Sequence, residues 1–275
     1  MVNADRGALV GNFYDLKQNS RREPTDMNPD KMRELLPEIV KRGFKDSVFR
    51  DYYKASRVLY QTKLNIPIMP ADGAPAAFEC EKEVQPRMWL VTYRGGVIAP
   101  KTGKFRFVGQ CDDILVVRFN NRPAFDYGYT IAGTGTHING RSAEVNGTTE
   151  NKDLEKEIKR NTPMDYPIPF YRYEKTPGHN RNIGGMAVGP TFNVEAGKTY
   201  PIEILIGEIP GGYFSVCLMI EEVGATYEKD PAGFPILPLF QLDNIPPAEM
   251  PGEQPPIAKD GPVWKFAAGA TKRDI

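Results

Sequence analysis

The sequence has few of the residues on which metal-dependent and nucleophilic enzymes rely. Its 275 residues include two histidines, His137 and His179, which stand in separate glycine-rich stretches without a His-Glu-x-x-His motif. The Gly-x-Ser-x-Gly motif that presents the serine of α/β-hydrolases is also missing. We therefore predict that the chain is not an enzyme.

Cysteine is equally scarce. The chain has three cysteines, Cys80, Cys111 and Cys217, and their spacing matches no zinc motif. An odd number cannot pair completely within one chain. We expect all three thiols to be free and mostly buried.

The sequence also lacks an excess of either charge and any long hydrophobic run. Lys plus Arg is 35 and Asp plus Glu is 35, so there is no overall field that would attract nucleic acid or an anionic membrane. No apolar segment is long enough to span a bilayer, and the residues after Met1 lack the hydrophobic core of a secretory signal. We predict no nucleic-acid partner and no membrane span.

Glycine and proline, by contrast, are abundant. The 26 glycines and 25 prolines are scattered between short apolar runs, as turns are in β proteins. This pattern predicts a mainly β, antiparallel body with long loops.

Two strand-like runs meet at an acidic corner between Lys104 and Asn120. Phe105 and Phe107 share one face of the first run, and the second run alternates in the same way. Asp112 and Asp113 stand between them, and two adjacent carboxylates repel each other. The pair predicts a turn that either holds a cation or caps backbone N–H groups without an ion.

A second turn follows the corner. Asn120 and Asn121 tolerate positive φ, and Pro123 cannot continue a central ladder, so the chain is predicted to form a hairpin that leads into Asp126. Later, Ile202 to Ile206 and Phe214 to Ile220 alternate as strands around a proline and glycine connector. We predict that these two runs form a hairpin.

These features resemble the protective-antigen (PA-fourteen) domain family over residues 88–128 and 192–222. The resemblance rests on the Asp-Asp pair, the strand that ends in Asn120, the short hairpin into Asp126, and the Ala-Gly-x-x-Tyr entry at 196–200. It implies an antiparallel β-barrel or sandwich used for binding. In the yeast adhesin branch the paired aspartates hold calcium that coordinates sugar hydroxyls, which would make Asp112 and Asp113 metal ligands. Such domains are usually exported, so we expect an extracytoplasmic location, the periplasm or the cell surface.

We divide the chain into a β-domain over 1–226 and a proline-rich tail over 227–275. The domain includes predicted N-terminal helices within 28–54, strands over 58–68 and 77–84, a buried Trp89, and an insertion over 130–190 with a short helix at 151–160. Trp264 and Phe266 would be costly to expose, so the tail is expected to dock on the domain or on another copy, which would make a homo-oligomer.

Two functions follow from these predictions. The first is a non-enzymatic module that binds carbohydrate at a calcium-assisted Asp112–Asp113 corner. The alternative is a structural or protein-interaction domain of a surface or envelope assembly, with no sugar or ion. Calcium needs about six to eight oxygen ligands, so the two aspartates are not the whole site. The sequence does not identify the other ligands or the residues that would contact a sugar.

Overall fold

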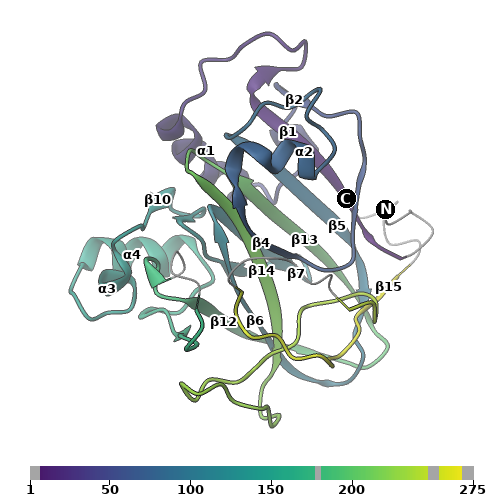
Figure 1. The fold of residues 1–275 in the computed structure, drawn as a ribbon, viewed down its shortest axis with the longest axis vertical. Coiled ribbons are helices and arrows are strands. Elements are labelled where there is room, and N and C mark those ends of the chain that lie inside the picture. The colour runs from purple at the N-terminus through teal and green to yellow at the C-terminus, as the bar shows by residue number, and fades with distance from the viewer. Residues whose placement is uncertain (1–6, 177–180, 247–253, 268–275) are drawn as a thin grey trace.

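Two antiparallel sheets lie face to face and contain most of the strands (Figure 1). The computed structural model describes residues 7–176, 181–246 and 254–267. In that part of the chain, the larger sheet has eight strands and the smaller has five. The prediction of a mainly β, sandwich-like fold is therefore confirmed.

The larger sheet runs in the order β2-β1-β5-β13-β7-β8, with β3 also paired to β1 and β15 to β5. Its strands are β1 (Leu9–Asn19), β2 (Tyr52–Lys54), β3 (Leu59–Gln61), β5 (Trp89–Ile98), β7 (Ile114–Phe119), β8 (Arg122–Asp126), β13 (Thr199–Glu208) and β15 (Lys265–Phe266). The smaller sheet has the order β11-β12-β6-β14-β4. Its strands are β4 (Asn65–Pro70), β6 (Gly103–Asp112), β11 (Phe170–Tyr171), β12 (Met186–Val194) and β14 (Tyr213–Glu222). A separate pair, β9 (Thr130–Ile131) with β10 (Thr136–His137), belongs to the insertion.

The core between the sheets is rich in aromatic rings. Trp89, which is fully buried as predicted, contacts Phe13 and Phe214 at centroid distances of 4.9 Å. The outer face of each sheet is covered as well. Both faces of β5, β13 and β14 are consequently buried, so these strands are apolar on both sides along much of their length.

Helix α1 (Pro29–Lys41) covers the outer face of the larger sheet. The side chain of Asn28 caps its N-terminus by accepting bonds from two backbone N–H groups, and Pro29 occupies a first-turn position. Met32, Leu36 and Ile39 are fully buried against this sheet, in a cluster with Leu90 and Leu205. The helix continues through Pro37, where the sequence predicted a kink or a weaker helix.

The second predicted N-terminal helix is wrong. Residues 46–53 form a 3-10 turn, Asp46–Val48, followed by β2, which pairs with β1 at the edge of the larger sheet. The aromatic spacing that suggested a helical face instead places Phe49 against Tyr14, with ring centroids 4.3 Å apart.

Two of the predicted strands also need correction. Residues 77–84 are not extended, because the chain forms a short helix, α2 (Ala74–Ala77), and then turns through Glu79 at φ 55°. An adjacent 3-10 turn, Ala71–Gly73, precedes α2. The run over 58–68 divides into β3 and β4, which belong to different sheets.

The insertion lies to one side of the sandwich, where Figure 1 shows its helices α3 (Ser142–Val145) and α4 (Lys152–Asn161). The helix predicted at 151–160 is confirmed as α4, which Leu154 and Ile158 anchor. The aromatic residues of the following segment contact the domain and the tail: Phe170 meets Tyr127 of the domain at 5.3 Å, and Tyr173 meets Phe234 of the tail at 6.2 Å. His179 lies outside the described residues.

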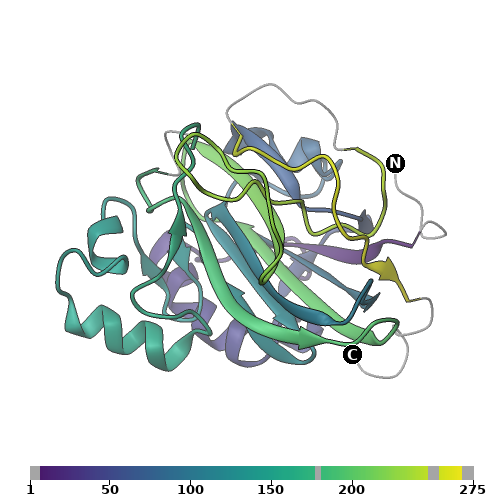
Figure 2. The ribbon, with the colours of Figure 1, turned by 90° about the horizontal axis from the view of Figure 1, so that it is seen from below.

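The C-terminal segment folds back on its own chain (Figures 1 and 2, yellow). Leu239 bridges to Met219 of β14, and Trp264 enters the core between the sheets with none of its surface exposed. Trp264 contacts the rings of Phe105 and Phe240 at 5.3 and 5.6 Å. These contacts do not support the homo-oligomer that the sequence allowed through this tail.

Candidate functional site

The acidic corner is a crossing between the two sheets. Strand β6 ends at Asp112 in the smaller sheet, and β7 begins at Ile114 in the larger one. The two strands are therefore not a hairpin, and the Asp112–Asp113 peptide bond, which is cis, lies where the chain changes sheet. The hairpin through Asn120 and Asn121 is confirmed, with φ of 50° and 61° at those residues.

A second crossing lies beside the first. The predicted hairpin between 202–206 and 214–220 is wrong, since β13 lies in the larger sheet and β14 in the smaller. Gly207 of β13 is paired with Ile114, and Ser215 of β14 is paired with Asp112. These two registers place Glu208, the last residue of β13, next to the aspartates.

Asp112, Asp113 and Glu208 form a carboxylate cluster. One carboxylate oxygen from each lies within 4.8 Å of the other two. The residues are 9%, 3% and 0% exposed, in that order. The backbone N–H of Ile209 donates a 2.8 Å bond to Oδ2 of Asp113, but neither carboxylate oxygen of Glu208 has a hydrogen-bond partner among the described residues.

The cluster holds its protons tightly when no cation is present. Burial, and then the charges of Asp113 and Asp112, raises the pKa of Glu208 to about 10. Burial and the neighbouring carboxylate likewise raise the pKa of Asp112, while the pKa of Asp113 is raised mainly by burial and is partly held down by the Ile209 N–H. Removing water from carboxylates disfavours their charged form, and close like charges add to that cost.

Two arginines partly offset the effect of burial on the pKa values of Asp113 and Glu208. Arg33 of α1 opposes the rise in the pKa of Asp113, and Arg87 opposes the rise in that of Glu208. Arg87 also pairs with Asp72 at 3.0 Å. The two arginines affect the pKa of these carboxylates less than burial does. Ionising the carboxylates of the cluster therefore still costs free energy that another cation would have to offset.

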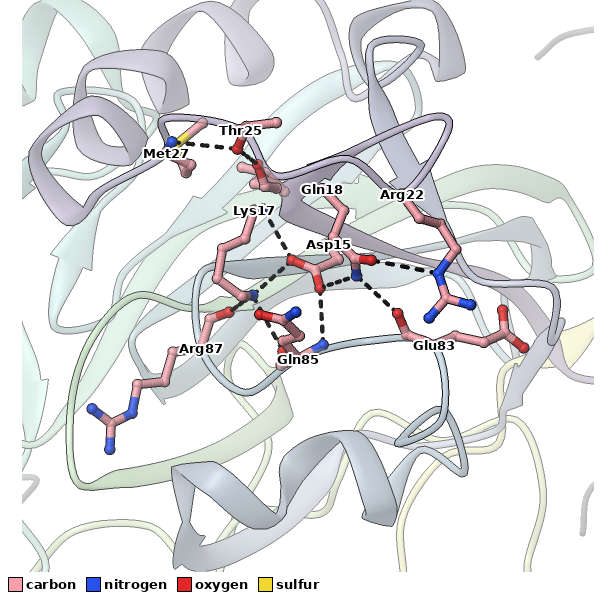
Figure 3. Close-up of polar contacts among 10 residues, drawn as sticks. Asp15, Lys17, Gln18, Arg22, Thr25, Met27, Glu83, Gln85 and Arg87 are labelled. Carbon is pink, nitrogen blue, oxygen red and sulfur yellow. Dashed lines mark hydrogen bonds and ion pairs between the residues drawn. The ribbon is translucent and has the colours of Figure 1, made fainter.

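The loop that carries Arg87 is fastened to β1 by the buried Asp15, at the centre of Figure 3. Asp15 accepts bonds from the side chains of Lys17 (2.6 Å) and Gln18 (2.7 Å) and from the backbone of Gln85 (2.9 Å). Lys17 also donates to the carbonyl of Arg87, and burial lowers the pKa of this lysine. Trp89 pairs with Asp15 on one side and Glu208 on the other, so this network supports the same end of the sheet.

Asp126, the aspartate into which the predicted hairpin leads, is not part of the cluster. Its carboxylate is fully buried and accepts bonds from the backbone N–H groups of Ala132 (2.9 Å) and Gly133 (2.7 Å). Burial raises the pKa of this carboxyl to about 7, and the two backbone bonds oppose that rise. Asp126 therefore fixes the start of the insertion, a structural role.

Gly128 lies against the crossing so closely that no side chain fits. A Cβ there would approach the carbonyl oxygens of Asp113 and Cys111 to 2.1 and 2.8 Å.

All three cysteines, including Cys111, are free and buried, as predicted.

We expect Gly128→Ala to lower the free energy of unfolding by about 1–3 kcal/mol, the range for overpacking a filled site. The backbone of Asp113 would have to move, so the cluster should be disturbed together with the fold. Urea unfolding measures the loss. Gly140→Ala is the matched control for loss of a glycine, because nothing lies within 4 Å of its Cβ position; its positive φ adds strain but no clash. Equal losses in the two variants would contradict the steric account.

The arrangement suits a hard divalent cation. All three side chains offer carboxylate oxygens, the ligands that calcium prefers, and the unpartnered Glu208 needs a positive partner to be buried in ionised form. Sequence reasoning found Asp112 and Asp113 and missed Glu208. An acidic residue at the end of an apolar strand, directly before the Ile-Pro-Gly-Gly connector, was the available signal.

No protein-family model matches the chain, and no curated protein matches its sequence. Among solved structures, the chain is similar to the PA14 sugar-binding domain of an RTX adhesin, with 13% identity, a TM-score of 0.42, and coverage of 81% of this chain and 93% of that one. It is also similar to the PA14 domain of the MpAFP antifreeze protein, with 12% identity, a TM-score of 0.40, and coverage of 80% and 84%.

A third similar structure is the A domain of epithelial adhesin 6 from Candida glabrata, solved with Galβ1-3GlcNAc. Its identity is 14%, its TM-score 0.39, and the coverage 85% of this chain and 93% of that chain. The first two of these structures are PA14 domains, the family that the sequence was predicted to resemble. In the part of the chain that the structure describes, no helix is long and apolar enough to cross a bilayer.

Proposed function

We propose that the chain is a calcium-dependent carbohydrate-binding module whose ion lies between Asp112, Asp113 and Glu208. The observation that carries the proposal is the Glu208 carboxylate, which is fully buried with both oxygens unpartnered. A native protein rarely leaves such a group without a partner, and a divalent cation would supply one for all three carboxylates at once.

Calcium fits the cluster better than magnesium. Calcium accepts about six to eight oxygens in flexible geometry, whereas magnesium demands a tight octahedron and gives up water reluctantly. Three carboxylates leave coordination positions open for water or for the hydroxyls of a bound molecule. A bound calcium ion would thus supply a point of attachment for neutral oxygen ligands.

Carbohydrate is the ligand class implied by the resemblance to protective-antigen domains over residues 88–128 and 192–222. Neighbouring sugar hydroxyls are neutral oxygen donors that can replace water on calcium. Asp112, the most exposed of the three ligands, marks the side from which a sugar would approach. Binding of this kind involves no bond cleavage. We also propose that the chain is located at the cell surface or outside the cell.

The test is a glycan array probed with the full chain in millimolar calcium and again in chelator. We expect binding in calcium that is lost in chelator and lost in Glu208→Gln. Glu195→Gln is the matched control, since that side chain is 72% exposed and stands before the first residue of β13, at the opposite end of the strand from Glu208. Glycan binding that persists in chelator would contradict the proposal.

One observation favours the alternative, a structural or protein-interaction domain. The cluster is nearly closed to solvent, and a buried ion with no access for a sugar would only stabilise the crossing of the two sheets. In that case calcium would raise the melting temperature while no glycan bound. The two measurements together therefore separate the two functions.

We expect the rise in melting temperature caused by calcium to be larger at about pH 8 than at about pH 5, because calcium must displace protons from the cluster. Without the ion, the pKa of Glu208 is about 10 in the folded chain and 4.5 in the unfolded chain. The contribution of this carboxyl to stability is therefore fully present below pH 4.5 and is lost as the pH rises towards 10. Calcium binds the ionised carboxylate and removes that loss. Differential scanning calorimetry with and without calcium measures the difference, and a larger rise at low pH would contradict this account.

A further inference from the structure

A cavity lies on the outer face of the larger sheet, beside the C-terminal end of α1. Its volume is about 820 Å³, and its lining comes from α1 and the residues after it, from β5, β7 and β13, and from the turn at Asn121. Five of the lining residues are cationic and two are acidic. Cavities of this size hold small organic molecules, and this one is unrelated to the carboxylate cluster.

Four side chains of the cavity form a network without net charge. Arg94, whose side chain is 8% exposed, lies 3.5 Å from Glu203 and pairs with Asp46, whose side chain is 60% exposed and lies at the opening of the cavity. Arg118 donates to Glu203 at 2.9 Å. Two arginines and two carboxylates cancel. Arg118 also donates through Nη2 to the carbonyl of Asn121, and its Nη1 makes no hydrogen bond to the described residues.

The rim of the cavity carries the excess positive charge. Lys41, Arg42 and Lys45 are exposed and form no salt bridge within the described part of the chain. They give the cavity a net charge of +3, against zero for the whole sequence. Three adjacent cations without carboxylate partners repel one another, so an anion would lower their energy.

The dipole of α1 explains the cation at Lys41 but not the one at Lys45. Lys41 stands in the last turn, where a cation favours the helix dipole. Lys45 lies four residues past the helix, beyond the reach of that effect. The carbonyls of Glu38, Ile39 and Val40 already accept backbone bonds from the residues that follow, which reduces the negative field that an anion would meet.

We propose that this cavity binds a sugar or similar small molecule that carries several sulfate or phosphate groups. Guanidinium groups match the oxygens of such anions, with Arg118 supplying a free donor from the network and Arg42 a second from the rim. Lys41 and Lys45 add flexible point charges. The site is separate from the calcium cluster, so it should work in chelator.

The experiment titrates the full chain with sucrose octasulfate at low ionic strength in chelator, with unsulfated sucrose in parallel. We expect saturable binding of one sulfated molecule per chain and none of sucrose. Combined Lys41→Gln, Arg42→Gln and Lys45→Gln substitution should weaken binding by about tenfold or more, the combined effect of three partly exposed charge contacts. None of these side chains forms a hydrogen bond or salt bridge in the described part of the chain, and circular dichroism checks that the variant folds.

The matched control removes three exposed cations elsewhere, with Lys82→Gln, Lys152→Gln and Lys229→Gln. It has the same net charge as the first variant and should bind like the parent. Equal weakening in both variants, or binding of sucrose itself, would overturn the proposal by showing a nonspecific effect. If the triple variant does not fold, Arg118→Lys and Lys45→Gln tested singly replace it, and unchanged binding in both would overturn the proposal. Inositol hexakisphosphate in a parallel titration shows whether phosphate or sulfate is the better ligand.

Discussion

In saturating calcium the chain is expected to melt several degrees higher than in chelator. An ion that binds the folded state alone stabilises it by about 2.7 kcal/mol at a hundred times its dissociation constant, which for a chain of this size shifts the melting temperature by roughly 2–4 °C per kcal/mol. The physical source is the attraction between the ion and the three carboxylates Asp112, Asp113 and Glu208, from which calcium displaces the protons that they hold in its absence. Magnesium at the same concentration should give a much smaller shift.

The variants Asp113→Asn and Glu208→Gln are expected to abolish this shift. In chelator Glu208→Gln should melt close to the parent, because burial already keeps that carboxyl protonated near neutral pH. Asp126→Asn is a matched control for a buried aspartate outside the cluster, since it should be less stable than the parent yet keep its response to calcium. Identical melting curves in calcium, magnesium and chelator would remove the proposed calcium site.

The second large effect is expected from Trp264→Ala, which should lower the free energy of unfolding by about 3–5 kcal/mol, the usual cost of truncating a buried aromatic. Trp264 is fully buried among Phe105, Phe119 and Phe240, and its backbone N–H donates to the carbonyl of Gln241 at 2.8 Å. Its removal would open a cavity between the sheets. Chemical denaturation measures the loss.

Light scattering provides the companion measurement for the tail. The contacts of Trp264 are within one chain, so the mass in solution should not change in the variant. Tyr213→Ala removes an aromatic ring that is 55% exposed and should cost little. A fall in mass without a loss of stability would show instead that the tail joins two copies.

The sequence predicted the local features of this fold because each depends on neighbouring residues. The cap of α1 needs Asn28 and Pro29 alone, and the turn after β7 needs two residues that accept positive φ, Asn120 and Asn121. Where local signals competed, the prediction failed. Residues 77–84 alternate in polarity as a strand would, yet Pro75 begins a helical turn and the fastening of Gln85 to Asp15 holds the following loop in place.

The acidic pair was also visible in the sequence, because Asp112 and Asp113 interrupt two apolar runs. Alternation of side chains fixes which residues of a strand face the core, and it does so whichever sheet the strand joins. It therefore predicted β6, β7, β13 and β14 as strands and wrongly joined the last two as a hairpin.

The tertiary structure decided which strands pair, and with that it decided the candidate site. Glu208 reaches Asp113 because β13 pairs with β7, about ninety positions earlier in the chain, and because both connections cross from one sheet to the other at the same end. Pairing across such a separation depends on the packing of the whole sandwich rather than on any local pattern. The sequence by itself thus determined the strands on either side of the acidic corner and two of the three carboxylates, while the third carboxylate and the burial of all three required the assembled sheets.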